Sequence, residues 1–325
     1  MNYIKKLFEI EKKPVRGLLA VEWAVVAYTA LTLMVLLFTY TKSVNPEAMV
    51  LGRMRVLATI VALWVVYRLV PCRLTRAARV ITQIVLLAWW YPDTYELNRV
   101  FPNLDHVFAS LEQTVFGFQP ALAFSARFPS PVVSELMSLG YASYYPLIAL
   151  VVFFYFFRRY EEFERCAFIV LSAFFIYYVI FVLVPVTGPT YYYKAIGTGN
   201  AAAGIFPDVH YYFNTHRECL PTPGYTDGTF YAMVEGAKAA GERPTAAFPS
   251  SHVGVATILL MLALHSRSKL LLVVLAPLYV LLCLSTVYIQ AHYAIDSIAG
   301  FVSGLLLYAL LFGLTGRMRQ RRVRR

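Results

Sequence analysis

Residues 151–157 read VVFFYFF, an apolar run with no alternation between apolar and polar positions. A transmembrane β-strand alternates lipid-facing and lumen-facing residues, so a continuous run of this kind favours an α-helix. The same character extends along the chain, because 59% of its 325 residues are hydrophobic and only 14% are charged. A soluble protein of this length rarely carries so much apolar surface. The sequence therefore predicts an all-α integral membrane protein, folded as a multi-span helical bundle.

Eight apolar segments have the composition of membrane spans. The third of them is short, and the second carries Arg53 and Arg55 near one end, so these two depart most from an ordinary span. The predicted spans cover residues 18–40, 52–70, 78–91, 133–157, 166–187, 249–264, 270–290 and 294–314.

The basic residues are distributed as expected for a membrane protein. The net charge is +11, and most of the 29 Lys and Arg residues fall at the span ends that share a side with the N-terminus. The positive-inside rule therefore predicts that both termini are cytoplasmic. Because these charges follow the topology, we expect no nucleic-acid partner. The four cysteines are scattered without CxxC spacing, which indicates neither a metal site nor a disulfide framework.

The loops divide the chain into three regions. Residues 1–77 hold an N-terminal amphipathic segment and two extra transmembrane helices, residues 78–316 form the main membrane domain, and residues 317–325 form a basic cytoplasmic tail. Two outward segments are too long to be simple connectors. Apolar positions at helical spacing predict interfacial helices on the outer face in residues 92–132. The outer loop 188–248 has a length that usually carries function.

Three polar stretches mark the outer ends of predicted spans. They read VPVTGPTYYYK (184–194), AAFPSSHVG (246–254) and STVYIQAHYAID (285–296). The topology alone requires all three to lie at one membrane depth, so we expect them to meet.

The second stretch has the features of an anion site. Pro249 at a helix start leaves the backbone N–H groups of Ser250, Ser251 and His252 pointing outward, along the positive end of the helix dipole. The two serine hydroxyls would either cap the helix or donate to a phosphate. Taken alone, however, a Pro-Ser-Ser sequence is more often an ordinary helix start.

The third stretch adds a potential nucleophile. His292 and Asp296 are four residues apart, which places them on one face of a helix. Asp296 would accept a hydrogen bond from one imidazole nitrogen and leave the other nitrogen free to attack. His252 would stand across the site as a general acid. A lone His-x3-Asp pair is commonly structural, but its coincidence with the second stretch favours phosphoryl transfer.

These motifs resemble a known family. FPSSH (248–252) and S-x6-H-x3-D (285–296) resemble the second and third signature motifs of the type 2 phosphatidic acid phosphatase (PAP2) superfamily. AAFPSSH and TVYIQAHYAID are most similar to its inositol phosphorylceramide synthase-like branch, and the resemblance covers about residues 90–314. It implies a six-helix core within residues 78–316 and a metal-independent phosphohistidine mechanism without a cofactor. The roles that it implies are nucleophile for His292, orienting residue for Asp296, leaving-group acid for His252, and phosphate contacts for Ser250 and Ser251.

The sequence departs from the phosphatase branch in its cations. Thr286 stands where that branch has an arginine, and GPTYYYK stands in place of its first motif, which contains a lysine and an Arg-Pro pair. The synthase-like branch lacks the same arginine, so the departure favours a transferase. Arg243 and Lys194 in the outer loop are the residues that we expect to supply positive charge to the phosphate.

The favoured hypothesis is a membrane lipid phosphotransferase with its active site at the outer or lumenal face. Its partners would be a lipid substrate in the bilayer and a polyol acceptor; with water as acceptor, the same residues would make a lipid phosphate phosphatase. A second class remains open, in which a non-catalytic lipid-binding or transport protein uses the histidines to gate a polar cavity. A metal site in the outer loop is a further alternative, although neither an HExxH motif nor a carboxylate triad supports it. It would use Asp208, His210, His216 and Glu218.

Overall fold

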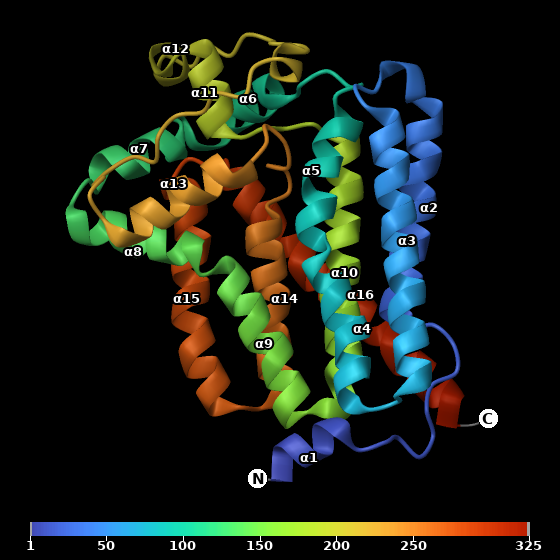
Figure 1. Ribbon diagram of the computed structural model, residues 1–325. Coiled ribbons are helices and arrows are strands. Elements are labelled where there is room, and N and C mark those ends of the chain that lie inside the picture. Colours follow the sequence, from blue (N-terminus) through green and yellow to red (C-terminus); the bar gives the residue numbers. More distant parts are fainter. Residues whose placement is uncertain (1, 324–325) are drawn as a thin grey trace.

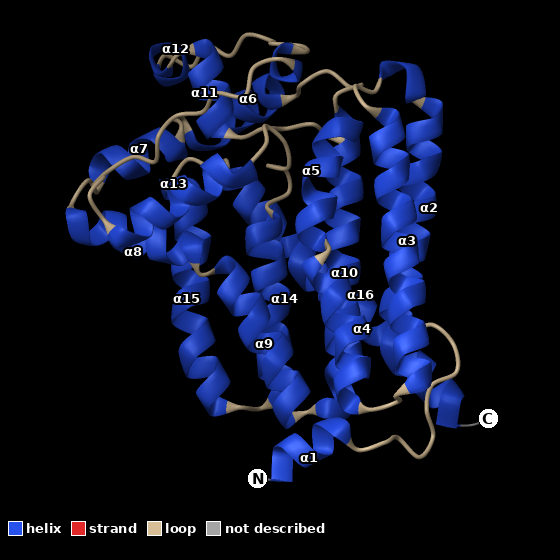
Figure 2. Cartoon of the chain, in the orientation of Figure 1, coloured by secondary structure: helices blue, strands red, loops and turns tan. Residues whose placement is uncertain are grey.

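The computed structural model describes residues 2–323, with side chains for residues 5–316. Every regular element in this part of the chain is a helix, and no strand occurs there (Figure 2). The helices are α1 (Asn2–Phe8), α2 (Ala20–Phe38), η1 (Tyr40–Lys42), α3 (Pro46–Leu69), α4 (Arg73–Val85), α5 (Leu87–Asn98), α6 (Asp105–Phe116), α7 (Pro120–Arg127), α8 (Pro131–Ala142), α9 (Tyr144–Arg158), α10 (Tyr160–Leu183), α11 (Pro189–Ile196), α12 (Thr198–Ala202), η2 (Tyr212–Asn214), α13 (Thr229–Gly241), α14 (Ser251–Ser266), α15 (Lys269–Tyr288) and α16 (Ala294–Val323).

The helix ends follow local sequence signals. The Asn45 side chain accepts a hydrogen bond from Ala48 N–H at the start of α3, and Pro46 occupies the first helical position. Ser268 caps α15 in the same way. Gly117 ends α6 in the left-handed conformation that glycine adopts without strain. Apolar runs between such signals make the long helices.

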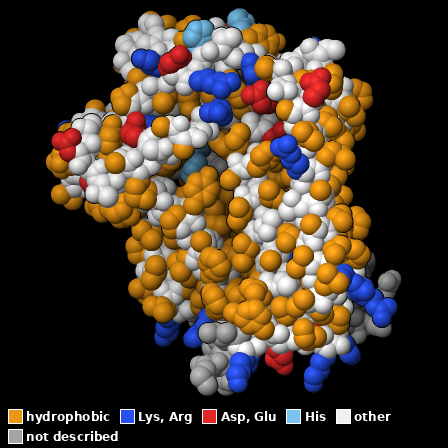
Figure 3. Space-filling model, in the orientation of Figure 1, with side chains coloured by type: hydrophobic (Ala, Val, Ile, Leu, Met, Phe, Trp, Pro, Cys, Tyr) orange, Lys and Arg blue, Asp and Glu red, His pale blue; other side chains and the backbone are white. Residues whose placement is uncertain are grey.

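The long helices form one bundle with distinct ends (Figure 1). Helix α10 lies at its centre and contacts α2, α4, α5, α9, α14 and α16. The shorter helices α6, α7, α11, α12 and α13 gather at one end, whereas α1 and the C-terminal end of α16 lie at the opposite end (Figure 1). On the face shown in Figure 3, hydrophobic side chains cover the middle of the bundle, and Lys and Arg side chains concentrate towards its ends.

Five helices of the described chain are long and apolar enough to cross a membrane. They are α2, α3, α10, α15 and residues 294–316 of α16, and the pair α8 and α9 makes a sixth if its 47° bend lies within one span. Helix α14 is apolar but shorter, with 16 residues. The prediction of an all-α membrane bundle is confirmed, although fewer helices meet the criteria for a span than the eight segments predicted.

The third predicted span, 78–91, differs most from the structure. It is divided between α4 and α5, which are separated at Leu86, and the boundary predicted after residue 77 falls inside α4. Neither helix is long enough to be a candidate span, since α4 has 13 residues and α5 has 12, and both contribute charges that are paired inside the bundle. Arg79 is fully buried, and its Nε donates to Glu22 Oε1 of α2 at 2.7 Å.

The structure also differs from the prediction in the outer segments, and the predicted tail lies outside the described side chains. Residues 92–132 were expected to be interfacial, but α5 occupies their first part and runs along the bundle (Figure 1). The fourth predicted span, 133–157, bends at Ser143, where α8 turns to pack against α13 and α15. The expected basic tail, residues 317–325, lies outside the residues whose side chains are described.

A buried ion pair explains the arginine inside the second predicted span. Arg53 of α3 is only 1% exposed, and its guanidinium binds both carboxylate oxygens of Asp93 on α5, at 3.1 and 2.7 Å. Its Nε also donates to Thr32 Oγ1 of α2 at 3.2 Å. The pair therefore fastens the two N-terminal helices to the rest of the bundle.

Arg53→Met should lower the free energy of unfolding by about 3–5 kcal/mol, because it leaves the Asp93 carboxylate buried without a counter-charge. Thermal unfolding in detergent measures the loss. Arg55→Met is the matched control, since Arg55 lies in the same helix but is exposed and should change stability little. The double variant Arg53→Met/Asp93→Leu should recover part of the loss. If Arg53→Met were as stable as the control Arg55→Met, the ion pair would have no stabilising role.

Candidate active site

The three polar stretches are in direct contact at the end of the bundle where the short helices gather. Ala247 N–H donates to Val186 O at 2.9 Å, which joins the second stretch to the first. Thr190 N–H donates to Gln290 O at 2.8 Å, which joins the first to the third. A side chain on Gly188 would come within 2.4 Å of Ala291 O, so only glycine allows this approach.

Two histidines face each other where these stretches meet. His252 lies in the first turn of α14, and His292 lies in the turn between α15 and α16. His252 Nδ1 is 3.2 Å from His292 Nε2, within hydrogen-bond distance. His292 is buried, whereas His252 is partly exposed.

The tautomer of His292 is set by a backbone group. Its Nδ1 donates to Ala247 O at 2.8 Å, and because a carbonyl oxygen only accepts, this nitrogen carries the proton. Burial lowers the pKa of His292 to about 4, so the ring is neutral near pH 7. The lone pair of a neutral imidazole is therefore on Nε2, the atom that faces His252.

Asp296 does not make the hydrogen bond predicted for it. Its Oδ2 is 3.8 Å from His292 Nδ1 and instead accepts from Tyr293 N–H at 3.0 Å. The helix begins only at Ala294, so His292 precedes it and the two residues do not share a helical face. Ala247 O takes the orienting role that the sequence assigned to Asp296, and Asp296 closes the first turn of its own helix.

The start of α14 offers fewer free donors than predicted. Ser250 N–H donates to Asp296 O at 3.0 Å, and Ser250 Oγ accepts from Val253 N–H at 3.4 Å as the helix cap. Among the described residues, only the N–H groups of Ser251 and His252 remain without a partner in this turn. Helix α16 packs closely here, because a side chain on Gly300 would lie 2.4 Å from Ser250 O.

Aromatic rings hold His252 from two helices. Tyr141 of α8 stacks on it with ring centroids 4.7 Å apart and planes inclined by 24°. Tyr144 of α9 lies on it at 4.3 Å and donates its hydroxyl to Ser251 O at 3.3 Å. The rings restrict where the imidazole can move.

Asp105, which the sequence analysis missed, joins the site to its support. The carboxylate is fully buried and accepts from Thr187 N–H at 2.7 Å, Gly188 N–H at 2.9 Å and the Tyr293 hydroxyl at 3.0 Å. The Thr187 hydroxyl and the Asn103 amide also donate to it, at 2.9 and 2.6 Å. Burial raises the pKa of Asp105, and these hydrogen bonds oppose the rise. No local motif marked this residue, apart from its place at a helix start.

Glu112 of α6 is a second buried carboxylate that the motifs did not indicate. Its Oε1 accepts from Ala294 N–H at 3.1 Å at the start of α16. Its Oε2 is buried without a hydrogen-bond partner among the described residues. Burial raises the pKa of Glu112 to about 8, so the group is largely protonated at neutral pH.

The two predicted cations occupy different environments. Arg243 is partly buried, and its Nη1 donates to Glu242 O at 3.2 Å. Lys194 is exposed in the last turn of α11, and within the described residues it makes no contact with either histidine. Of the two predicted cations, Arg243 is therefore the partly buried one and Lys194 the exposed one.

In the described part of the chain, the outer-loop residues Asp208, His210, His216 and Glu218 do not form a metal-binding group. Among the described residues, no group of three or more His, Cys, Asp or Glu side chains could hold a metal ion. Asp208 pairs only with His210 at 3.2 Å and His106 at 3.5 Å.

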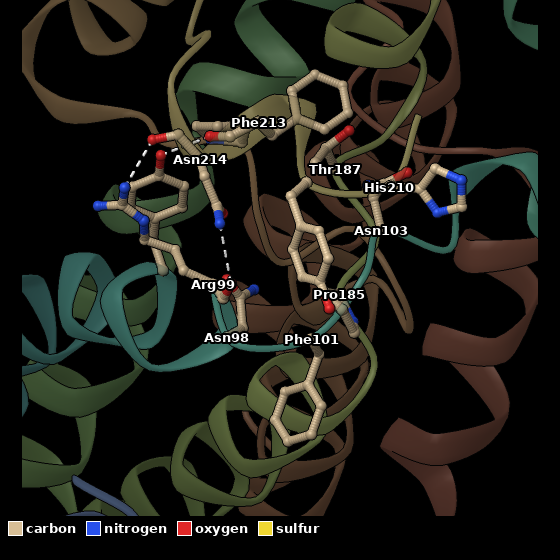
Figure 4. Close-up of a pocket in the computed structure, with 12 residues that line it drawn as sticks. Asn98, Arg99, Phe101, Asn103, Pro185, Thr187, His210, Phe213 and Asn214 are labelled. Carbon is tan, nitrogen blue, oxygen red and sulfur yellow. Dashed lines mark hydrogen bonds between the residues drawn. The ribbon is translucent and has the colours of Figure 1, made fainter. Parts of the chain in front are cut away.

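A cavity between the end of α5 and residues 210–214 is separate from the histidine pair (Figure 4). Its empty volume is about 260 Å³, part of it open solvent. The polar groups in its wall satisfy one another, since Arg99 donates to Asn214 O at 2.7 Å and Asn214 donates to Arg99 O at 3.0 Å. Neither His252 nor His292 lines it.

A family model described as the PAP2 superfamily matches residues 106–310, well over half of the chain. The chain belongs to the PAP2 superfamily. No curated protein and no solved structure matches it. The match extends from α6 to α16 and includes both histidines, and it leaves α1 to α5 outside.

Membership in the PAP2 superfamily supports a phosphatase or phosphotransferase that acts on phosphate esters. The neutral His292, with Nε2 directed into the site, is the geometry that such a reaction needs in a nucleophile. The superfamily prediction made from the motifs is confirmed.

Asp105→Asn should lower turnover on the order of 10²-fold, because an amide cannot accept all the donors that now position Thr187, Gly188 and Tyr293. Product release from a labelled lipid phosphate in detergent measures the effect. Asp208→Asn is the control, since this carboxylate bonds only within the outer loop and to a neighbouring histidine. Wild-type turnover in Asp105→Asn would show that the site keeps its shape without this carboxylate.

Proposed function

We propose that this PAP2 protein is a membrane lipid phosphotransferase of the inositol phosphorylceramide synthase-like kind. It would transfer a phospho-headgroup through a phosphohistidine on Nε2 of His292. The observation that carries the proposal is the hydrogen bond from Nδ1 to Ala247 O, because it leaves the lone pair on Nε2 in a buried, neutral ring.

In the first step, Nε2 of His292 attacks the phosphorus of the lipid. A P–N bond forms, the P–O bond to the leaving alcohol breaks, and the imidazolium form of His252 donates a proton to the leaving oxygen and returns to neutral imidazole. Burial lowers the pKa of His252 in the free site, so the ring takes up this proton when the phosphate anion binds beside it. In the structure His252 Nδ1 occupies the approach to Nε2 at 3.2 Å. The phosphate must therefore displace His252 from His292, and this frees the His252 nitrogen for the leaving group. The N–H groups of Ser251 and His252 at the start of α14 are our candidates for binding the phosphate oxygens.

In the second step, an acceptor hydroxyl attacks the phosphohistidine. Thr286 supports a transferase, because it stands where the phosphatase branch has an arginine. It is fully buried, its hydroxyl donates to Cys283 O at 2.9 Å, and it lies 2.9 Å from the Ser297 hydroxyl. This side chain links α15 to α16 and leaves no cation at its position. Arg243 is our remaining candidate for a phosphate-binding cation.

We also propose that the active site faces the outer or lumenal side and that both termini are cytoplasmic. The start of α14, whose first turn holds His252, lies towards the end of the bundle opposite α1 and the C-terminal end of α16 (Figure 1). The positive-inside rule supports this orientation, since most basic residues belong to the end that carries the termini.

Purified protein supplied with a labelled lipid phosphate, with and without inositol, tests the function. We expect labelled enzyme with the acid lability of a phosphohistidine, and a product that contains inositol. His292→Ala should abolish both, whereas His216→Ala, in the exposed outer loop, should retain them. Product formed from water alone would replace the transferase by a phosphatase. Unchanged turnover in His292→Ala would overturn the mechanism, and lipid binding without turnover in the wild type would indicate a non-catalytic protein.

The pH dependence provides a second test. Burial lowers the pKa of His292 to about 4, so the nucleophile stays neutral as the pH falls from 7 to 5. The acid limb of kcat/KM for phosphohistidine formation should therefore lie near pH 4. The stability contributed by the neutral ring is present above pH about 6.5 and is lost as the pH falls towards 4, because the unfolded chain binds the proton more tightly. An acid limb near pH 6.5 in a rapid-mixing assay would contradict the assigned environment.

A further inference from the structure

We propose that Glu112 is a positioning residue for the nucleophile, and that it acts by holding a proton that it shares with Asp296. Glu112 lies in α6, and Asp296 lies in the first turn of α16, four residues after His292. The inference rests on the proposed function, because it takes His292 as the nucleophile and explains what holds the segment that carries it.

The two carboxyl groups bind consecutive backbone groups. Glu112 Oε1 accepts from Ala294 N–H at 3.1 Å, and Asp296 Oδ2 accepts from Tyr293 N–H at 3.0 Å. These two nitrogens are three covalent bonds apart, and the free N–H groups at a helix start point in a common direction. The carboxyl groups are therefore neighbours at the start of α16, where α6 and α16 contact each other.

Each carboxyl group has one oxygen left over. Glu112 Oε2 and Asp296 Oδ1 are buried without a hydrogen-bond partner among the described residues, and both side chains are fully buried. A buried polar atom without a partner is costly, and so are two ionised carboxylates side by side. One proton between these oxygens removes both costs, since a protonated carboxyl group donates and a carboxylate accepts.

The surroundings of the pair offer no compensating cation. The other titratable side chains around it are Asp105, Tyr193, His292 and Tyr293. Asp105 adds negative charge, the tyrosines are neutral phenols, and His292 is a neutral ring whose Nδ1 lies 3.8 Å from Asp296 Oδ2. In the described part of the chain, no Lys or Arg side chain pairs with either carboxyl group. Burial therefore raises the pKa of Glu112 to about 8, and repulsion from Asp296 adds to the rise.

The shared proton stabilises the segment around the nucleophile. Asp296 Oδ2 holds the N–H of Tyr293, which follows His292 directly, and Asp296 O accepts from Ser250 N–H at the start of α14. Without the proton, two buried carboxylates repel each other and push α6 away from the start of α16. His292 then loses its alignment with the phosphorus, and a displacement of about 1 Å is enough to slow such a reaction strongly.

The first test is the alkaline limb of kcat, measured with the full-length protein and a labelled lipid phosphate in detergent. Wild-type turnover should fall about tenfold as the pH rises through about 8, because Glu112 ionises there. Glu112→Gln should keep turnover at pH 7 within about threefold of wild type, since the amide oxygen accepts from Ala294 and the amide nitrogen donates to Asp296. The alkaline limb should be absent in this variant.

Two further variants separate positioning from folding. Glu135→Gln makes the same change in a carboxylate that accepts from Phe230 and Tyr231 N–H at the start of α13, and it should keep the wild-type alkaline limb. Glu112→Ala removes both hydrogen bonds and should lower turnover at pH 7 about 10²-fold. A purely structural role predicts instead that Glu112→Ala and Glu112→Gln lower the unfolding temperature alike and leave the pH profile in place.

Infrared spectroscopy detects the proton without requiring turnover. The difference spectrum between the wild type and Glu112→Gln at pH 7 should contain the C=O band of a protonated carboxyl group. This band should disappear as the pH rises above about 8, where Glu112 ionises.

The outcomes distinguish the two proposals. A wild-type protein that forms no phosphohistidine overturns the proposed function and the positioning role with it, whereas the carboxyl band reports the shared proton separately. An absent band, or an alkaline limb that persists in Glu112→Gln, overturns the shared proton alone. Loss of turnover at every pH in a folded Glu112→Gln variant also overturns it, because the reaction would then need the carboxylic acid itself.

Discussion

The Asp105 carboxylate is the interaction on which the arrangement of the site depends. It is fully buried, and donors from three segments of the chain satisfy it: Asn103 just before α6, Thr187 and Gly188 after α10, and Tyr293 before α16. A buried charge is stable only with such compensation, so the segments cannot separate without a large cost. By holding Tyr293, Asp105 also sets where the adjacent His292 lies.

Backbone groups do much of the remaining positioning around the histidines. The carbonyl of Ala247 sets the tautomer of His292, and the carbonyl of Asp296 takes the N–H of Ser250. Close packing between α14 and α16 at Gly300 makes the second contact possible. The site is thus a junction of helix ends, at which His252 and His292 contact each other directly.

The N-terminal helices show how the bundle accommodates charge. The family match begins at residue 106, and in the part of the chain that precedes it two buried ion pairs, Arg53 with Asp93 and Arg79 with Glu22, join α2 and α3 to α4 and α5. Inside an apolar bundle an unpaired charge is costly, so each pair makes its helices interdependent. The arginine that made the second predicted span look unusual is therefore a link between helices. It could not be interpreted alone, because its partner is 40 residues away.

The sequence by itself determined the helical membrane class, the PAP2 motifs and the meeting of three stretches at one end of the bundle. Apolar runs, helix-start signals and motif spacing are local properties, so they can be recognised without a structure. Only the tertiary structure decided how the side chains are used. It directs Nδ1–H of His292 to Ala247 O instead of Asp296, leaves Lys194 in solvent, and places the buried carboxyl groups of Asp105 and Glu112 at the junction. The physical reason is that these choices depend on contacts between distant residues, such as Asp105 with Tyr293, 188 positions apart, which leave no local pattern.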